Sequence, residues 1–238
     1  MRTQTELMIE IIDLSQEIFS GMPVFPGLPS VSITVHQSHE ELDGIADSDV
    51  LSPAVNKLEL GEHTGTHVDA INHMGRQFRG QSIDTMPLAM FYTEGICVDV
   101  SHKRFRELIE ISDLQEALRK ADLEIKRGDT VLIYTDHYRR AFGTDNWHNG
   151  PGVSTAAARW LGEQGIAAFG VEPASPGVRG VSNKEVHHIC GELGFTHYEN
   201  MMNLHQLVGR GRFRFVGLPL KIKGGTGSPV RAVAVFEA

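Results

Sequence analysis

Cysteine is scarce in this chain of 238 residues, which has only Cys97 and Cys190 and no C-x-x-C pair. Both cysteines have apolar sequence neighbours, so we expect reduced core residues and no disulfide framework. Long hydrophobic runs are also lacking, since no apolar stretch approaches the roughly 20 residues of a membrane span. The first seven residues contain no apolar segment, which predicts the absence of a signal peptide and, by default, a cytoplasmic protein.

Positive charge is in deficit as well. The chain has 22 Lys and Arg against 30 Asp and Glu, a formal net charge of -8, and no run of basic residues. Nucleic acid and anionic membrane surfaces are therefore not expected partners. No G-x-G-x-x-G sequence follows a strand into a helix, so dinucleotide binding has no support. A hydrophobic content of 41% with 22% charged residues is ordinary for a well-cored globular protein.

Hydrophobic periodicity and capping residues predict a mixed order of elements. Capping-box sequences at 112–115 and 182–185, and an N-cap at Ser154, predict three helices. Residues 38–54 are acidic and rich in turn formers, which predicts an exposed loop or flap. Strands first and mixed elements later favour an α/β fold with residues 1–238 in a single domain. The expected strands are 31–35, 131–134, 166–171, 213–220 and 230–236.

Histidine, in contrast, is plentiful and concentrated. Three of the 12 histidines and one carboxylate lie between His63 and His73, and all four are at odd-numbered positions. Alternate residues of a strand share a face, so His63, His67, Asp69 and His73 would project together from extended chain. A helix would turn Asp69 and His73 away from the other two. Imidazole and carboxylate are the usual ligands of zinc, manganese and iron, so we interpret the segment as a metal site.

A straight strand would hold this site too far open. Its Cα atoms at His63 and His67 would lie roughly 13 Å apart, whereas ligation needs metal–nitrogen distances near ~2.0–2.1 Å. We therefore expect a bend between the two histidines at Gly65, which tolerates a bulge or kink. The alternative is a Thr-rich strand that carries three surface histidines by chance.

A second concentration of ligand-type side chains occurs later in the chain. Each of these histidines alone is more typical of a surface or packed residue than of a ligand. A helix followed by a strand can bring such residues together, but the sequence does not show that it does. The group consists of His187, His188, His197, Glu199 and His205.

The sequence resembles the cyclase-like metal-dependent hydrolase family, which includes bacterial kynurenine formamidases and isatin hydrolases. The resemblance rests on the run His63-Thr64-Gly65-Thr66-His67-Val68-Asp69 with His73, on the turn 21–27, and on the tail segments 218–222 and 227–231. It extends from about residue 11 to residue 235. It implies a swivelling β/β/α-type fold with a mixed sheet and flanking helices, and a homo-oligomer, either a dimer or a tetramer.

The same resemblance implies roles for individual residues. His63, His67 and Asp69 would bind the metal, and His187 and Glu199 would complete a second or shared coordination sphere. Of the adjacent pair His187 and His188, we assign His187. His73 would be the catalytic acid/base. The implied cofactor is a divalent metal, Zn or Mn, with one or two ions per subunit. This sequence departs from the family pattern at one place next to the expected substrate pocket. The family commonly has Ala-Pro after the aspartate, whereas this chain has Ala70-Ile71-Asn72.

These residues permit metal-assisted hydrolysis of a small-molecule substrate. A divalent metal acidifies bound water, Asp69 can offer one oxygen to each of two ions, and His73 can pass a proton to the leaving atom. The chain has neither G-x-S-x-G nor H-E-x-x-H, which disfavours a serine hydrolase and a helix-borne protease site. We predict a hydrolase of C–N amide bonds, either an arylformamide or a cyclic amide such as isatin. The alternatives are a lactonase and a non-catalytic metal- or ligand-binding protein. Candidates for the pocket wall are the loop 146–152 and Phe25, Phe91, Tyr92, Trp147 and His148.

Overall fold

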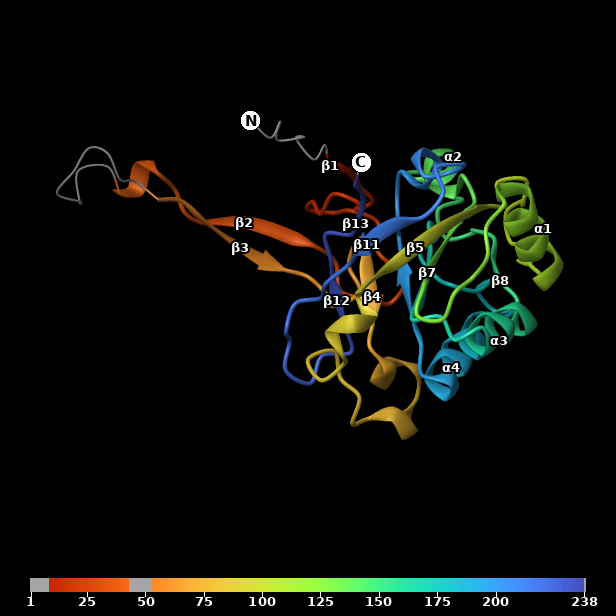
Figure 1. The fold of residues 1–238 in the computed structure, drawn as a ribbon. Coiled ribbons are helices and arrows are strands. Elements are labelled where there is room, and N and C mark those ends of the chain that lie inside the picture. Colours follow the sequence, from red (N-terminus) through yellow and green to blue (C-terminus); the bar gives the residue numbers. More distant parts are fainter. Residues whose placement is uncertain (1–8, 43–52, 238) are drawn as a thin grey trace, which may run out of the picture.

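The structure, a computed structural model, describes residues 9–42 and 53–237 and is built around a large mixed sheet (Figure 1). Within these residues the strand order is β1-β13-β11-β5-β7-β9-β10-β4-β12. The predicted α/β class with a mixed sheet is confirmed. Parallel pairing joins the central strands, which are β5 (Tyr92–Asp99), β7 (Thr130–Tyr134), β9 (Ala168–Val171) and β10 (Thr196–Glu199).

The parallel strands form the core of the sheet. Every residue of β7 and of β9 is buried, as expected for parallel strands that are covered on both faces. Leu132, Ile133 and Phe169 are among their fully buried side chains. Cys97 and Cys190 are buried and free, as the sequence predicts.

Antiparallel strands extend the sheet on both sides. The predicted closing strands are shorter than expected: the first ends at Val216, and the second begins only at Val233. A separate parallel pair consists of β6 (Leu108–Ile109) and β8 (Gly152–Val153). The strands that flank the parallel core are β1 (Ile9–Asp13), β11 (Phe213–Val216) and β13 (Val233–Glu237) on one side, and β4 (His67–Asp69) and β12 (Gly227–Pro229) on the other.

Three α-helices, α1 (Ile111–Ala121), α3 (Thr155–Glu163) and α4 (Asn183–Leu193), lie together beside the sheet (Figure 1). A short fourth helix, α2 (His137–Ala141), follows β7. The predicted cap of α3 is confirmed, since the Ala157 N–H donates to Ser154 Oγ at 3.1 Å. The remaining helical turns are of the 3-10 type: η1 (Glu40–Leu42), η2 (Ile71–Met74), η3 (Arg76–Phe78), η4 (Leu88–Met90) and η5 (Leu204–Gln206).

The two predicted capping boxes differ from the observed helix starts. Helix α1 begins two residues earlier than expected, and its capping box is formed by Glu110 and Asp113. Ser182 occupies the N-cap of α4 but makes no cap hydrogen bond. Its hydroxyl donates instead to the carbonyl of Val153 at 2.8 Å, a partner distant in sequence.

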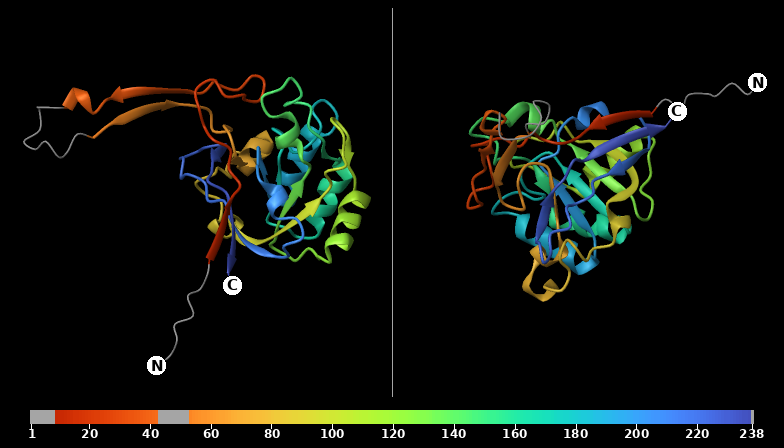
Figure 2. Two further views of the ribbon diagram at one scale, coloured as in Figure 1. Left: turned by 90° about the horizontal axis from the view of Figure 1, so that it is seen from above. Right: turned by 90° about the vertical axis from the view of Figure 1, so that its left-hand side faces the viewer.

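Strands β2 (Ser32–Gln37) and β3 (Val55–Glu59) pair as an antiparallel arm that projects from the body of the protein (Figure 2). Of the predicted loop 38–54, residues 43–52 lie outside the described residues, as does the N-terminal segment 1–8. Among the helices in the described part of the chain, none has the length and apolar character needed to cross a membrane.

Candidate metal centre

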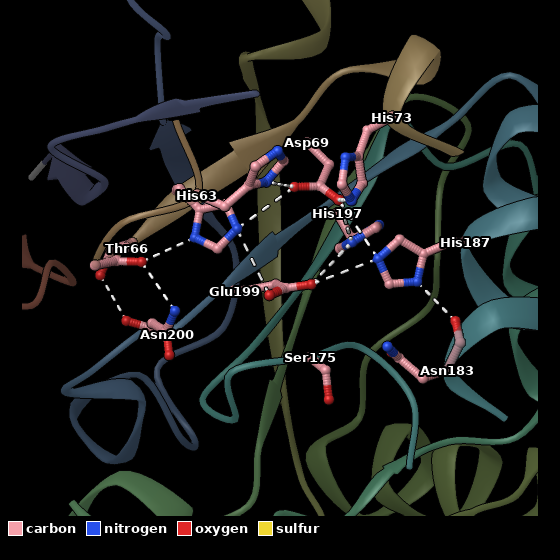
Figure 3. A network of polar contacts seen from close by, with 12 residues as sticks. His63, Thr66, Asp69, His73, Ser175, Asn183, His187, His197, Glu199 and Asn200 are labelled. Carbon is pink, nitrogen blue, oxygen red and sulfur yellow. Dashed lines mark hydrogen bonds and ion pairs between the residues drawn. The ribbon is translucent and has the colours of Figure 1, made fainter. Parts of the chain in front are cut away.

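Two neighbouring antiparallel strands, β4 and β10, create the centre of the site. Glu199 pairs with His67, and the register continues so that His197 lies opposite Asp69. Because alternate strand residues share a face, these four side chains project from the same face of the sheet. All four residues are buried. Figure 3 shows Asp69, His197 and Glu199 converging on one point.

The predicted bend at Gly65 is confirmed. Gly65 has a φ of 60°, in the left-handed region that favours glycine, and its carbonyl accepts a hydrogen bond from His67 Nδ1 at 2.9 Å. The prediction of one extended segment through all four ligand-type residues is wrong at both ends. His63 lies in the turn before β4, and His73 lies in the 3-10 helix η2. The turn and the helix shorten the span, so the side chains still converge.

His63 is held by contacts at both ring nitrogens. Its Nε2 donates to Thr226 Oγ1 at 3.1 Å, and its Nδ1 lies 2.7 Å from Asp69 Oδ1. Thr226 in turn donates its hydroxyl proton to Glu62 at 2.6 Å. A Cβ on Gly227 would lie 2.7 Å from the His63 ring, so this ring requires glycine at that position. Burial opposes protonation of His63, but the charge of Asp69 and the hydrogen bond to it raise its pKa.

His73 is the most accessible histidine of the cluster. Its side chain is 37% exposed, against 10% for His63 and 15% for His187. Its ring centroid lies 4.2 Å from that of His63, and its Nε2 lies 3.7 Å from Asp69 Oδ2. Burial, together with the neighbouring imidazoles, lowers the pKa of His73 despite the opposing charge of Asp69.

Helix α4 contributes His187, whose Nε2 lies 3.5 Å from Asp69 Oδ2 and 3.8 Å from Glu199 Oε1. The adjacent His188 points away from the cluster. Its side chain is 49% exposed and contacts Glu192 at 3.2 Å. Of this pair, the structure therefore brings His187 and not His188 to the site.

Backbone carbonyls set the tautomers of two of these histidines. His67 Nδ1 donates to the Gly65 carbonyl, and His187 Nδ1 donates to the Asn183 carbonyl at 2.6 Å. A carbonyl oxygen only accepts, so in each neutral ring the proton is on Nδ1 and Nε2 carries a lone pair. Both lone pairs face carboxylate oxygens, with His67 Nε2 lying 3.4 Å from Asp69 Oδ1. Lone pairs facing anionic oxygens repel unless a cation lies between them.

The carboxylates themselves stay ionised. Burial would raise the pKa of Asp69, but the charges of His197 and His63 and the close approach of the His187 and His197 rings hold it well below its usual range. Burial likewise opposes ionisation of Glu199, whose pKa is lowered by its hydrogen bond with His197 and the charge of His67. Asp69 Oδ2 is buried and makes no hydrogen bond within the described residues. Two buried anions, an unpaired carboxylate oxygen and inward-facing imidazole lone pairs fit a divalent metal ion.

A cavity of about 280 Å³ opens over the cluster. Residues 25–28 line one side, and Ser175 and Asn183 line another. The Asn183 carboxamide oxygen accepts from the Gly177 N–H at 3.2 Å, which orients its amide nitrogen. In Figure 3 the Asn183 and Ser175 side chains lie across from Glu199.

Of the predicted aromatic wall, Phe25 lines this cavity. Phe91 is fully buried in the hydrophobic core, and Tyr92 is 54% exposed on β5, so neither belongs to the wall. Trp147 and His148 line a smaller hollow behind Phe25, where the His148 ring meets that of Phe25 edge-on at 6.4 Å. The loop 146–152 therefore supports the cavity wall from behind.

His197 is the cluster residue that the predicted site lacks. It is completely buried, and its Nε2 lies 3.2 Å from Asp69 Oδ2 and 3.3 Å from Glu199 Oε1. A signal was present in the sequence: His197-Tyr198-Glu199 has the same alternation of histidine and carboxylate as His67-Val68-Asp69. His205 lies apart from the cluster, with its ring beside Tyr134.

Comparison with known proteins assigns this chain to a family. The Cyclase family model, described as "Putative cyclase", matches residues 12–178, and the chain therefore belongs to the Cyclase family. A kynurenine formamidase of Salinibacter ruber is 28% identical over 224 residues, covering 94% of this chain and 96% of that protein. An isatin hydrolase of Roseibium aggregatum is 25% identical over 247 residues, covering 95% of this chain and 92% of that protein.

Solved structures agree with these sequence relatives. Isatin hydrolase A from Ralstonia solanacearum superposes with a TM-score of 0.82 at 27% identity, covering 96% of this chain and 92% of that chain. The predicted family and fold class are confirmed. The predicted enzyme class, a metal-dependent amidohydrolase, is confirmed by relatives named as a formamidase and as a hydrolase.

Proposed function

We propose that this chain hydrolyses the C–N amide bond of a small aryl formamide or of a cyclic amide such as isatin, with the help of divalent metal ions. One observation carries the proposal: imidazole lone pairs face two shared, buried carboxylates at the floor of a cavity. The names of the relatives, kynurenine formamidase and isatin hydrolase, supply the substrate class.

The proposed ligands are the five expected from the sequence, His63, His67, Asp69, His187 and Glu199. Each carboxylate presents its two oxygens to different neighbours: Asp69 Oδ1 faces His63 and His67, whereas Asp69 Oδ2 faces His187. A divalent ion held there supplies Lewis acidity, which acidifies water and polarises a carbonyl group. The shared carboxylates suit one or two ions, and both zinc and manganese use these donors.

We assign proton transfer to His73. It lies at the accessible edge of the cluster and lines the cavity, so it can reach a bound substrate. In hydrolysis the oxygen of one water molecule bonds to the carbonyl carbon as the C–N bond breaks. His73 takes a proton from this water and delivers it to the leaving nitrogen, which yields a carboxylic acid and an amine.

The cavity suits a small, flat substrate. At about 280 Å³ it lies just below the roughly 300–1,000 Å³ of typical ligand pockets. The Phe25 ring provides an apolar wall for an aromatic group, and the Asn183 amide nitrogen is turned toward the cluster, where it can donate to a carbonyl oxygen (Figure 3). Ile71 stands where the family commonly has a proline after the aspartate and alanine, so the preferred amide within this class is expected to differ between relatives.

The proposal is tested by elemental analysis and a substrate panel on the same preparation. We expect bound zinc or manganese, and hydrolysis of N-formyl aryl amines or cyclic amides that chelation abolishes and the metal restores. A panel of lactones, assayed in parallel, distinguishes an esterase activity. Full turnover without any bound ion would refute the mechanism, and a metal-loaded protein inactive on the whole panel would favour a binding protein.

Three further features remain part of the proposal. We expect residues 1–238 to form one domain, the chain to assemble into a dimer or tetramer, and the protein to be cytoplasmic. Light scattering of the purified protein measures the assembly directly.

A further inference from the structure

The donor atoms around His197 form a compact group. His197 Nε2 lies 3.2 Å from Asp69 Oδ2 and 3.3 Å from Glu199 Oε1. His187 Nε2 approaches the same two oxygens at 3.5 Å and 3.8 Å. One ligand atom from each of the four residues lies within 4.8 Å of all the others.

These separations match the edges of a coordination tetrahedron. With metal–ligand distances near 2.0–2.1 Å, the ligand atoms of a tetrahedral zinc site lie roughly 3.3–3.4 Å apart. Four of the six edges, from 3.2 to 3.8 Å, bracket this value. The buried Asp69 Oδ2, which makes no hydrogen bond to any described residue, is one vertex of this group.

His197 is also held rigidly in this position. It is completely buried on β10, and its ring stacks on Phe169 with centroids 5.6 Å apart. The His187 ring meets it edge-on at 4.7 Å. A donor fixed by packing needs no rearrangement to bind an ion, because its rotamer is already ordered.

A second set of donors shares the same carboxylates but faces the cavity. His67 Nε2 lies 3.4 Å from Asp69 Oδ1 and 3.5 Å from Glu199 Oε2, which are the other oxygen of each carboxylate. His63, His67 and His187 line the cavity, whereas His197 does not. The two oxygens of each carboxylate thus face different histidines, and among these donors His197 is the one that does not reach the cavity.

We propose that Asp69, His187, His197 and Glu199 form an inner cation site closed by four protein ligands, with His197 as the fourth. This inference rests on the proposed function and refines it. The substrate-activating ion then belongs to the outer donors, His63 and His67 with the remaining carboxylate oxygens. The inner site is distinguished by His197, which is completely buried and does not line the cavity.

The test is metal binding, which does not depend on activity. Wild-type protein stripped with a chelator is titrated with Zn²⁺ and, separately, with Co²⁺, whose visible absorption reports a four-coordinate site. We expect two ions per chain. His197→Val is expected to keep one ion and to weaken the other by at least about 100-fold, since loss of an outer-shell partner alone costs 10–100-fold.

His188→Val is the matched control, because His188 is the neighbouring histidine of α4 and lies outside the cluster. We expect it to bind two ions with wild-type affinity. Two ions bound with unchanged affinity by His197→Val would overturn the inner site while leaving the proposed hydrolase intact. A wild-type protein that binds no divalent ion would instead refute the proposed function itself.

A crystal structure of the zinc-loaded wild type covers the case in which the buried substitution prevents folding. We expect an anomalous difference peak about 2.0–2.1 Å from His197 Nε2. Zinc peaks that all lie more than about 3 Å from this atom would exclude His197 as a ligand.

Discussion

The carboxylates of Asp69 and Glu199 lie among histidine rings, whereas the carboxylate of Glu172, directly after β9, lies among neutral hydrogen-bond donors. Glu172 Oε2 accepts from Thr135 N at 2.8 Å, Thr135 Oγ1 at 2.7 Å and His137 N at 3.1 Å. Burial raises the pKa of Glu172 to about 7 against these hydrogen bonds, while the pKa of Asp69 is held low. Asp69 and Glu172 are both buried, but their pKa values shift in opposite directions, because only Asp69 faces histidine rings that can carry a positive charge. This contrast separates a cation site from a structural carboxyl group.

The largest expected effect comes from removing the shared charge of the site with Asp69→Asn. The amide cannot offer an anionic oxygen to either set of histidines, so we expect metal content to fall below about one tenth of wild type, with hydrolysis falling in parallel. Elemental analysis and an amide hydrolysis assay measure the two quantities. Asp145→Asn makes the same chemical change at an exposed position and is expected to behave as wild type. Full occupancy and unchanged activity in Asp69→Asn would contradict the bridging role.

His73→Ala separates binding from chemistry within the site. We expect hydrolysis to fall by roughly 10²–10⁴-fold, the usual contribution of a general acid or base, with nearly unchanged metal content. The reason is position: His73 is the most exposed of the cluster histidines and lies 3.7 Å from Asp69 Oδ2. Activity and bound metal are measured on the same sample, with His188→Ala as control. A loss of metal equal to the loss of activity would make His73 a ligand instead.

Glu172→Gln tests whether the pKa of Glu172 is raised, through the pH dependence of the free energy of unfolding. The pKa of Glu172 is raised from 4.5 to about 7, so the folded state binds the extra proton between these values. The free energy of unfolding should therefore fall by about 3 kcal/mol from pH 4.5 to pH 7 on account of this group, and change no further above pH 7. Glu172→Gln should lack this fall. Denaturant unfolding of both proteins across this range measures it.

Glu124→Gln, at an exposed carboxylate, is the control and should keep the wild-type pH profile. A Glu172→Gln protein that loses stability between pH 4.5 and pH 7 as steeply as wild type would show that Glu172 is ionised throughout.

The sequence predicted the parts of this contrast that depend on local geometry. The bend at Gly65 followed from the span between His63 and His67 and from the reach of a ligand. The buried strand over 131–134 and the cap at Ser154 followed from pattern and capping chemistry, and both are observed.

The pairing of strands that are distant in the sequence could not be predicted in this way. The opposition of His197 and Asp69 depends on the register between β10 and β4, and no local pattern encodes which strands become neighbours. The same limit applies to Ser182 at the start of α4, whose hydroxyl donates to the carbonyl of Val153 in strand β8. The choice of His187 over His188 came from family resemblance, and the helix packing that orients the two rings was not derivable from the sequence.

The smallest expected effect comes from Thr135→Val, which keeps the side-chain shape but removes one donor to Glu172. Loss of a hydrogen bond to a charged group should cost about 1–2 kcal/mol at pH 8, where Glu172 is ionised. At pH 5 the carboxyl group is protonated and needs this donor less, so the loss should shrink. Denaturant unfolding at the two pH values gives the difference.

Thr130→Val is the matched control, because Thr130 is also fully buried but its hydroxyl pairs with that of Thr93 at 2.7 Å, a neutral partner. Its cost should therefore be the same at pH 5 and pH 8. If both valine variants lose stability equally at the two pH values, the Thr135 hydroxyl does not stabilise an ionised carboxylate. Packing alone would then hold the Glu172 side chain in place. The different pKa shifts of Glu172 and Asp69 would be explained only by the histidines that surround Asp69.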